Sequence, residues 1–305
     1  MKFIIITMKL IIPFITIMKV ALAVNDDYIK QINFMNLSWT LDNNKFGNIK
    51  HDLFKKRNGY YHSSEYYPVF DTEFSNMLYQ HLPDNYDWRT KGVVGDVKDQ
   101  GQCGSCWAFS AISSLESQLS ILTNINYILS EQEIVDCVKN IDTCCDGCNG
   151  GEMYAVYKYL SGTEDELNEN YPYTATDGSC KALKSSVPYN VSGYKSIIPN
   201  NEHILKYYLF NIGPISVGVN ANRDWQLYKN GIYDPDTENC PNSNGDIDHG
   251  VVIVGYGSDN GLDYWIIRNS WGKDWGENGY IRISRGKNTC GVANSPLFPT
   301  INTKL

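Results

Sequence analysis

The chain has 305 residues, a formal net charge of −8 at pH 7 and an isoelectric point near 5.1. This acidic balance argues against nucleic acid or an anionic membrane as the main partner. Hydrophobic residues make up 42% and charged residues 20% of the chain, which excludes a disordered or fibrous protein. The nine cysteines are an odd number, which in a secreted chain leaves at least one thiol outside the intramolecular disulfides.

Residues 1–23 are typical of a signal peptide, because a mostly apolar run over 3–17 precedes a small-x-small cleavage site at 21–23. The alternative is a retained membrane anchor, which two lysines in the apolar part make less favourable. Entry into the secretory pathway would make disulfides the default state of paired cysteines. Two sequons, at Asn36 and Asn190, would be glycosylation sites in a secreted chain.

The region 24–82 contains no cysteine and mixes aromatic residues with Asn and Lys. Short helical patterns occur over 28–35 and 50–56. The pair Leu82-Pro83 enforces an extended backbone and indicates a boundary. We therefore expect a segment with a separate role over 24–82 and a larger domain over 83–305.

The most informative stretch is a Gly-rich turn that carries a thiol, Cys106, and leads into apolar residues at helical spacing over 107–122. That spacing predicts an amphipathic helix with one buried face. At the helix N-terminus, unpaired N–H groups and the macrodipole would lower the pKa of the Cys106 thiol and favour the nucleophilic thiolate. The alternative is that the cysteines of this turn only anchor a disulfide.

The remaining chain changes from helical to strand-rich patterns. Ser130 and Glu133 form a capping box that opens a helix, the Gly- and Cys-rich stretch 144–151 predicts a loop, and 153–160 predicts another helix. Beyond Gly193 the sequence predicts short strands over 215–219, 250–255, 264–268 and 279–284, with one helix over 204–210. This order predicts an α+β fold of two packed subdomains.

Two C-x-x-C pairs, at 103–106 and 145–148, permit a tetrahedral zinc site or a dithiol redox centre. Those interpretations leave His249 and Asn269 without a role. The other candidate is a nucleophilic cysteine whose proton is taken by a histidine that an amide holds in place.

The second half supplies the partners for such a nucleophile. His249 lies at the mouth of an apolar, glycine-flanked strand, although a lone histidine there is usually structural. Asn269 lies at the end of another strand, and Trp271 could cover the amide from water, which would strengthen its hydrogen bond. Cys106, His249 and Asn269 also follow in the order and at the spacing of a known class of protease site.

The run Cys103-Gly104-Ser105-Cys106-Trp107 is similar to the signature of the papain-like cysteine proteases. The resemblance covers residues 82–299, and further matching blocks are Gln100-Gly101, Cys148-Asn149-Gly150-Gly151, Tyr171-Pro172-Tyr173, Asp248-His249-Gly250 and Asn269-Ser270-Trp271-Gly272. It implies the papain-like α+β fold, in which a helical N-terminal half packs against a β-barrel-like C-terminal half with the cleft between them.

The resemblance also implies the catalytic roles. Cys106 would be the nucleophile, His249 its base, and Asn269 the group that orients the imidazole. Trp271 would shield the bond between the last two. The side-chain amide of Gln100, with the backbone N–H of Cys106, would form the oxyanion hole.

Substrate contacts follow from the same resemblance. Gly150 and Gly151 would offer a backbone edge to an extended peptide. Met153 and Ser295 would line the pocket for the residue two positions before the scissile bond, and Asp248 would lie among the substrate-binding residues. The neutral Ser295 indicates a preference for apolar or aromatic residues over Arg, which the nearby Glu152 could modify, and Met153 could also be simply a core residue.

The implied disulfides are Cys103–Cys148, Cys137–Cys180 and Cys240–Cys290. Cys144 and Cys145 are then left over, and they could form a vicinal disulfide, rearrange the Cys148 pairing, or stay reduced. The stretch between Gly151 and Tyr171 is too short for the occluding insertion of cathepsin B, so we expect an endopeptidase.

The segment 24–82 resembles an inhibitory propeptide. The run 44–48 resembles the Asn-x-Phe-x-Asp pattern of cathepsin L-type propeptides with Asn48 in place of Asp, while the shortness of the segment is reminiscent of cathepsin B-like members. The expected product is a zymogen of the secretory pathway, destined for a lysosome, a vacuole or the outside of the cell. Its expected partners are protein or peptide substrates, its own propeptide and cystatin-like inhibitors. We expect a monomer without metal or cofactor that binds neither nucleic acid nor, once mature, a membrane.

Two rival functions come from other classes of protein. One is a catalytically silent homologue, which the presence of all four catalytic residues disfavours. The other is the zinc or disulfide-exchange protein described above.

Overall fold

The computed structural model describes residues 25–62, 81–140, 144–162, 170–181 and 189–303, so the expected signal peptide lies outside the described residues. A first helix runs over 25–34. The other α-helices of the described residues are α2 (His51–Phe54), α4 (Cys106–Thr123), α5 (Glu131–Cys137), α6 (Met153–Leu160), α7 (Glu202–Ile212) and α8 (Arg223–Leu227). The strands are β1 (Trp39–Leu41), β2 (Tyr86–Asp87), β3 (Tyr189–Ser196), β4 (Ile215–Val219), β5 (Tyr228–Tyr233), β6 (His249–Asp259), β7 (Leu262–Arg268), β8 (Tyr280–Ser284) and β9 (Leu297–Thr303).

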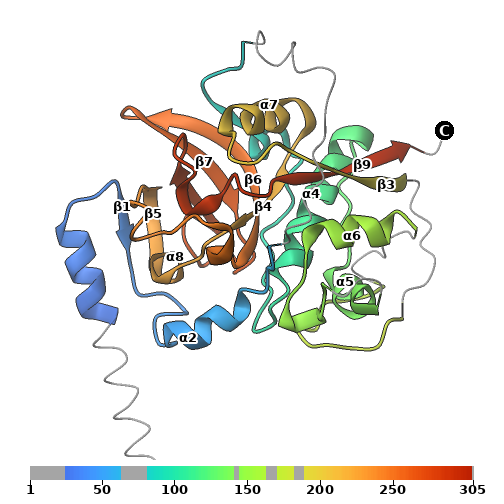
Figure 1. The fold of residues 1–305 in the computed structure, drawn as a ribbon, viewed down its shortest axis with the longest axis horizontal. Helices are drawn as coiled ribbons and strands as arrows, with labels where there is room; N and C mark the ends of the chain where they lie inside the picture. The colour runs from blue at the N-terminus through green and yellow to red at the C-terminus, as the bar shows by residue number, and fades with distance from the viewer. Residues whose placement is uncertain (1–24, 63–80, 141–143, 163–169, 182–188, 304–305) are drawn as a thin grey trace, which may run out of the picture.

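All of these strands belong to one mixed sheet in the order β1-β5-β8-β7-β6-β4-β9-β3, with β2 paired to β6. Most neighbours are antiparallel, whereas β5 and β8 run parallel. Figure 1 shows strands β4 to β8 on one side of α4 and helices α5 and α6 on the other, where β9 and β3 extend the sheet above α6. The expected α+β class is confirmed.

The two largest hydrophobic cores of the described residues correspond to the two sides. The larger core lies under the sheet and includes Trp225, Trp265 and Trp275. The second core surrounds α4, α5 and α6 and includes Trp107 and Tyr157. Because α4 lies between the two sides, a residue at its N-terminus reaches both of them.

Helix α4 differs from the amphipathic helix that we expected, since every residue from Cys106 to Ser120 is buried. Most of its polar positions are serines, which are small and can donate their hydroxyl hydrogens to backbone carbonyls, whereas the buried Glu116 forms an ion pair with Lys98. Ser110 donates to the Val251 carbonyl at 2.7 Å and Ser114 to the Pro214 carbonyl at 2.8 Å. The helix is therefore packed on all sides. The hydroxyl groups of these two serines bind carbonyls of β6 and of the residue before β4 instead of water.

The other expected elements are largely present. Ser130 Oγ accepts a hydrogen bond from the Glu133 amide at 3.0 Å, as the capping box predicts. Strand β4 has the expected bounds, and β6, β7 and β8 contain or closely match the predicted strands. The expected separation into a helical and a strand-rich half is incomplete, because β3 pairs with the C-terminal strand β9 beside α4 and α6.

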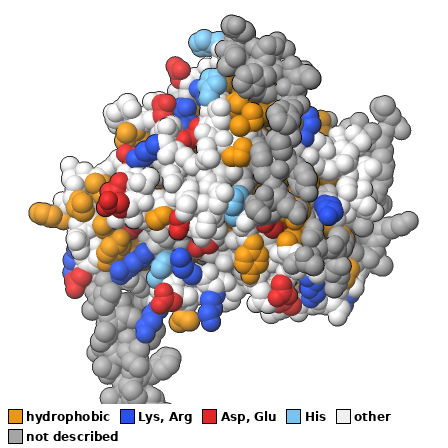
Figure 2. Space-filling model, viewed as in Figure 1, with side chains coloured by type: hydrophobic (Ala, Val, Ile, Leu, Met, Phe, Trp, Pro, Cys, Tyr) orange, Lys and Arg blue, Asp and Glu red, His pale blue; other side chains and the backbone are white. Residues whose placement is uncertain are grey.

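The N-terminal segment (residues 25–62) lies along the rest of the molecule, as the blue elements of Figure 1 show. Trp39 of β1 pairs with Gly231 of β5. Phe46 and Phe54 make edge contacts with Trp271, at ring-centroid distances of 5.9 and 4.9 Å. Figure 2 shows acidic and basic side chains interspersed on this face, without a patch of one sign. Within the described ranges, no helix is long and apolar enough to cross a membrane.

Candidate active site

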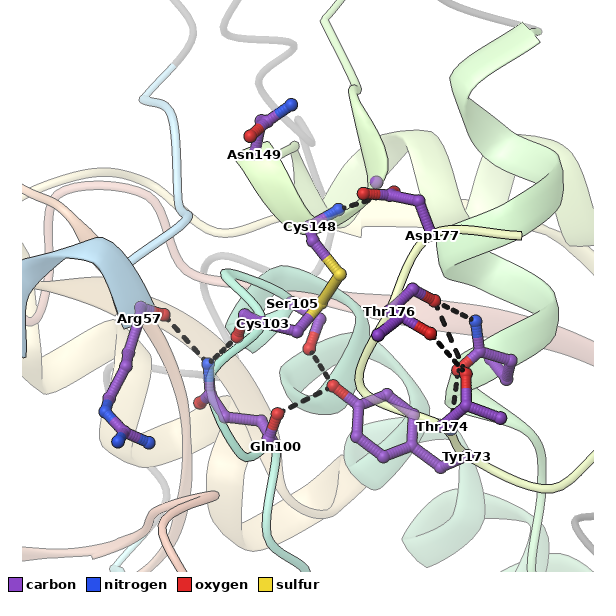
Figure 3. Close-up of a disulfide and its surroundings, with 12 residues drawn as sticks. Arg57, Gln100, Cys103, Ser105, Cys148, Asn149, Tyr173, Thr174, Thr176 and Asp177 are labelled. Atoms are coloured by element: carbon purple, nitrogen blue, oxygen red, sulfur yellow. Dashed lines mark hydrogen bonds between the residues drawn. A yellow bond between two sulfur atoms is a disulfide. The ribbon is translucent and has the colours of Figure 1, made fainter. Parts of the chain in front are cut away.

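Cys106 is the first residue of α4 and is fully buried. The turn before it is held by the Cys103–Cys148 disulfide and by a hydrogen bond from the Gly104 amide to the Cys148 carbonyl at 2.9 Å. Figure 3 shows this disulfide joining the turn to the loop that carries Asn149. The nucleophile candidate is thus placed by a helix N-terminus on one side and a covalent bond on the other.

His249 and Asn269 lie together at the ends of neighbouring strands. His249 begins β6, Asn269 follows β7, and Nε2 of the histidine lies 2.8 Å from Oδ1 of the asparagine. The Trp271 ring stacks on the imidazole with a centroid distance of 4.6 Å and an interplanar angle of 25°. This bond and this ring hold the imidazole in one orientation, and Nδ1 makes no hydrogen bond within the described part of the chain.

The strand that carries His249 passes close to the start of α4. A Cβ atom on Gly250 would lie 3.0 Å from the Cys106 carbonyl oxygen, so the absence of a side chain at this position allows the approach. The Gly250 and Trp107 amides also donate hydrogen bonds to the Cys106 sulfur. The strand that begins at His249 therefore packs directly against the first residue of α4, Cys106.

Gln100 lies beside the turn that precedes Cys106, and both polar atoms of its side chain are hydrogen-bonded. Its Nε2 donates to the Cys103 carbonyl at 2.9 Å and to the Arg57 carbonyl at 2.8 Å. Its Oε1 accepts from Ser270 Oγ at 2.6 Å, a contact that our reading of the sequence missed. Because Arg57 belongs to the N-terminal segment, a peptide carbonyl already occupies the amide expected to form the oxyanion hole (Figure 3).

The N-terminal segment continues as an extended peptide over the thiol. The Gly59 amide donates to Cys106 Sγ at 3.2 Å. The Gly151 amide donates to the Gly59 carbonyl at 2.8 Å, and the Tyr61 amide donates to the Gly151 carbonyl at 3.2 Å. Gly151 is therefore a backbone edge that pairs with a peptide, and the pairing is parallel.

Glycines are required where the peptide crosses the turn. A Cβ atom on Gly59 would lie 1.8 Å from the Gly104 carbonyl oxygen, and one on Gly151 would lie 2.7 Å from the Trp107 ring. Gly150 has a φ of 130°, which side chains rarely allow. The peptide and the edge can approach each other only because these positions lack side chains.

Tyr60 fills a pocket next to this edge and is 4% exposed. Its amide donates to the Asp248 carbonyl at 3.0 Å and its phenol oxygen lies 2.9 Å from Ser295 Oγ. The pocket wall is open at Gly218, where a Cβ atom would lie 2.4 Å from the Tyr60 ring. Burial and, to a smaller degree, the charge of Glu152 raise the pKa of the Tyr60 phenol.

Met153 is fully buried in the same hydrophobic core as Tyr60, and its sulfur lies 3.0 Å from Ser110 Oγ. Asp248, beyond its backbone contact, accepts from the Ala221 amide at 3.0 Å. The structure thus places Met153 and Asp248 around the Tyr60 pocket in different ways: Asp248 touches the peptide, while Met153 belongs to the core that supports it.

The buried environment sets the protonation of the two catalytic candidates. Loss of hydration raises the pKa of the Cys106 thiol to about 12, against hydrogen bonds from Gly250 and Gly59 that lower it. Burial lowers the pKa of the His249 imidazole to about 4, against the bond with Asn269. With the N-terminal segment in place, burial therefore favours a neutral thiol and a neutral imidazole, and the lowered pKa of Cys106 that we expected from its position at a helix N-terminus is wrong for this covered site.

The structure contains the disulfides Cys103–Cys148, Cys137–Cys180 and Cys240–Cys290. Since Cys103 and Cys148 are bonded to each other, the two C-x-x-C pairs do not supply four zinc ligands. No cluster of metal-ligating side chains occurs among the described residues. Cys144 and Cys145 lie outside these disulfides.

Residues 82–300 match the model of the papain family cysteine proteases. The chain belongs to this family. Papain-family members hydrolyse peptide bonds, so the chain is a cysteine peptidase.

Relatives of this papain-family chain include procathepsin L of Rattus norvegicus, 42% identical over 87% of this chain and 78% of that protein. Human cathepsin L2 is 38% identical over 86% of this chain and 78% of that protein. Among solved structures, digestive procathepsin L 3 of Tenebrio molitor has a TM-score of 0.82 and 31% identity, covering 93% of this chain and 91% of that one.

These relatives are of the cathepsin L type, so the expected likeness of the prosegment to cathepsin B finds no support in them. The recombinant stem bromelain precursor also matches over 93% of this chain, with a TM-score of 0.82 and 34% identity. That coverage extends beyond the matched family residues into the N-terminal segment. The chain is therefore similar to papain-family precursors and not only to their mature domains.

Proposed function

We propose that this chain is the inhibited precursor of a cysteine endopeptidase whose inhibitory propeptide spans residues 24–82 and whose mature domain spans 83–305. The observation that carries the proposal is that the N-terminal segment contacts both the expected nucleophile, Cys106, and the expected oxyanion donor, Gln100. The Gly59 amide binds the Cys106 sulfur, and the Arg57 carbonyl binds the Gln100 amide. A peptide seated on the nucleophile and on the oxyanion donor is an inhibitor of the site.

In the open enzyme, His249 takes the thiol proton and Cys106 attacks the carbonyl carbon of the substrate. The oxyanion that forms accepts hydrogen bonds from the Gln100 side chain and the Cys106 amide. His249 then protonates the leaving amine, which breaks the C–N bond and leaves an acyl-enzyme. Water, deprotonated by the same imidazole, releases the acid and restores the thiol. Asn269 orients the ring at each step.

The bound segment resists cleavage because it presents an amide N–H to the Cys106 sulfur. Gly59 offers its N–H at 3.2 Å, so the sulfur accepts a hydrogen bond from the segment. The parallel pairing of Tyr60 with Gly151 fixes the position of Gly59 over the sulfur. Removal of the segment would rehydrate Cys106 and His249, reversing the loss of hydration that keeps both neutral.

Substrate preference follows from the side chain in the pocket. Tyr60 shows that the space bounded by Gly218 and Ser295 accepts an aromatic ring. We infer a preference for apolar or aromatic residues two positions before the scissile bond. The group that meets the end of the side chain in this pocket is the neutral Ser295 hydroxyl, while the charge of Glu152, which raises the pKa of the Tyr60 phenol, is the feature that would favour Arg instead.

The remaining expectations concern location and partners. The secretory pathway, with a lysosome, a vacuole or the cell exterior as destination, is the location that fits an N-terminal signal peptide and a zymogen. Cystatin-like inhibitors would compete for the same peptide-binding edge. We further propose a monomer, in which one chain supplies every catalytic residue.

The test uses the processed enzyme and an epoxysuccinyl inhibitor of thiol proteases. The wild type is expected to take one adduct, on Cys106, and to hydrolyse peptides with Phe or Leu two positions before the cleaved bond faster than peptides with Arg there. Cys106→Ala should lose both the adduct and the activity, whereas the control Cys144→Ser should keep both. Equal turnover by Cys106→Ala and wild type would refute the catalytic assignment, and a preference for Arg would refute the pocket assignment.

A further inference from the structure

Cys144 and Cys145 are neighbours in sequence, and their sulfur atoms lie 2.8 Å apart. Both are outside the three disulfides, and the proposed catalytic mechanism uses neither. Cys144 is partly exposed, whereas Cys145 is 5% exposed. The structure thus holds two thiols in contact, one of which a small reagent can reach.

This pair lies directly behind the peptide-binding edge. The Glu152 amide donates to Cys145 Sγ at 3.4 Å, and the Asp146 amide donates to the Gly150 carbonyl at 2.8 Å. A Cβ atom on Gly151 would lie 3.0 Å from Cys145 Sγ. The Cys145 sulfur and the backbone of the next residue, Asp146, are therefore hydrogen-bonded to the residues on both sides of Gly151.

We propose that Cys144 and Cys145 are a redox-sensitive modification site, at which a small-molecule disulfide oxidises the two thiols to a vicinal disulfide, and that this oxidation weakens peptide binding at Gly151. The second half of the proposal rests on the proposed function, because it assigns Gly151 to substrate binding. The first half concerns thiol chemistry alone.

The reaction balances in two exchanges. The Cys144 thiolate attacks one sulfur of the reagent RSSR, which forms a mixed disulfide and releases one thiolate RS⁻. The Cys145 thiol, losing its proton to RS⁻, attacks Cys144 Sγ and displaces the second RS⁻, which takes a proton from solvent. The dithiol loses two electrons and two protons, and RSSR becomes two RSH.

The order of attack follows from the surroundings of the two sulfurs. The hydrogen bond with Cys144, followed by burial, raises the pKa of the Cys145 thiol. Cys145 therefore stays protonated until its partner has been activated, and the more exposed Cys144 reacts first. The contact distance of 2.8 Å then makes the second step intramolecular.

Closure of the bond must move the backbone. Adjacent Cα atoms are about 3.8 Å apart across a trans peptide, whereas disulfides usually need about 4.4 Å or more. The bond is therefore strained and readily reduced, which is typical of regulatory disulfides. Movement of Cys145 would be passed to Gly150 and Glu152 through the two hydrogen bonds named above.

The first experiment tests the chemistry on the full-length precursor, in which Cys106 is buried under Gly59. The precursor is incubated with oxidised glutathione, alkylated and digested, and the peptide with Cys144 and Cys145 is examined by mass spectrometry. The wild type should lose two hydrogens on this peptide and regain them with a mild reductant. Cys145→Ser should instead retain a glutathione adduct on Cys144. Two alkylated thiols after oxidation, or a stable adduct on the wild type, would overturn the proposal.

The second experiment tests the effect on peptide binding. The processed enzyme is oxidised while a reversible peptide aldehyde protects Cys106, and the aldehyde is then removed. The oxidised wild type should show a KM raised about fivefold with kcat nearly unchanged, as expected for the loss of about one hydrogen bond in binding. Cys144→Ser/Cys145→Ser should show no change.

Two results would contradict the effect on binding: an unchanged KM in protein whose vicinal disulfide is verified by mass, or equal inhibition of the double variant. Complete inactivity of the enzyme in both redox states would instead refute the proposed function, and the result on the precursor would still decide the thiol chemistry.

Discussion

The phenol oxygen of Tyr60 lies 2.9 Å from Ser295 Oγ, although 235 positions separate the two residues. This contact joins the N-terminal segment to the far end of the chain inside the pocket next to the peptide-binding edge. Tyr60 is 4% exposed, so its hydroxyl has left water and depends on this partner. We therefore expect the pocket to accept an aromatic residue that carries a hydroxyl group, and to bind that hydroxyl through Ser295.

The first prediction is that Ser295→Ala lowers kcat/KM about tenfold for substrates with Tyr two positions before the cleaved bond. The reason is that a buried phenol would lose its partner, at a cost of roughly 1–3 kcal/mol. The matching Phe substrate is the control and should be cleaved at nearly the wild-type rate. Parallel losses for both substrates would show that Ser295 supports the pocket without contacting the phenol.

The second prediction concerns inhibition by the N-terminal segment. Tyr60→Ala should raise the rate at which an active-site thiol reagent labels Cys106 in the full-length precursor by on the order of 10²-fold, since truncating a buried aromatic side chain costs about 3 kcal/mol or more. The control is Tyr61→Ala, because Tyr61 is 51% exposed and the variant keeps its backbone bond to Gly151 while losing the bond from its phenol to the Asn149 carbonyl, so a much smaller increase is expected. If both variants are labelled at the same rate, the pocket does not hold the segment.

The third prediction addresses the oxyanion hole. Gln100→Ala should lower kcat of the processed enzyme by on the order of 10²–10³, with little change in KM, because its amide donor acts on charge that develops in the transition state. Ser270→Ala removes the 2.6 Å bond that holds Gln100 Oε1 and should cause a smaller loss. A reduction in kcat of less than tenfold for Gln100→Ala would contradict the assigned role.

Much of the fold could be predicted because its patterns are local. The capping box at Ser130, the β-branched run of β4 and the periodicity of α4 each depend on neighbours in sequence. The burial of α4 on all sides could not be predicted in this way. Serines at 110 and 114 look polar in the sequence, and only their distant carbonyl partners make them core residues.

The sequence motifs predicted the catalytic candidates, but they did not predict which residues of the N-terminal segment cover them. Cys106, His249 and Asn269 stand out in the sequence because each is surrounded by Gly or Trp at a strand or helix end. Tyr60 and Gly59 carry no comparable pattern. Their role depends on tertiary pairing with Gly151 and Cys106, which local sequence does not encode.

The last prediction concerns the effect of pH on stability through Asp224, which is 5% exposed. Its carboxylate accepts hydrogen bonds from Tyr28 of the N-terminal segment and from Tyr233. Burial raises the pKa of Asp224 despite these bonds and the nearby positive charge of Arg223. In the unfolded chain an Asp has a pKa of about 3.9.

The sign of the effect follows from proton counts. Between about pH 4 and the raised pKa of the folded state, the native protein binds more protons at Asp224 than the unfolded chain does, so this group makes the free energy of unfolding fall as pH rises. Asp224→Asn removes that term while keeping an oxygen acceptor. In a Cys106→Ala precursor, the unfolding midpoint of the variant should therefore rise relative to that of its parent as pH increases from 4 to 7. Each 1 kcal/mol of difference in the free energy of unfolding corresponds to a shift of roughly 2–4 °C. Asp236→Asn, at an exposed position, is the control for loss of charge and should show no such trend. A difference in unfolding midpoint that is constant over this pH range would show that Asp224 is charged throughout and that its hydrogen bonds outweigh its burial.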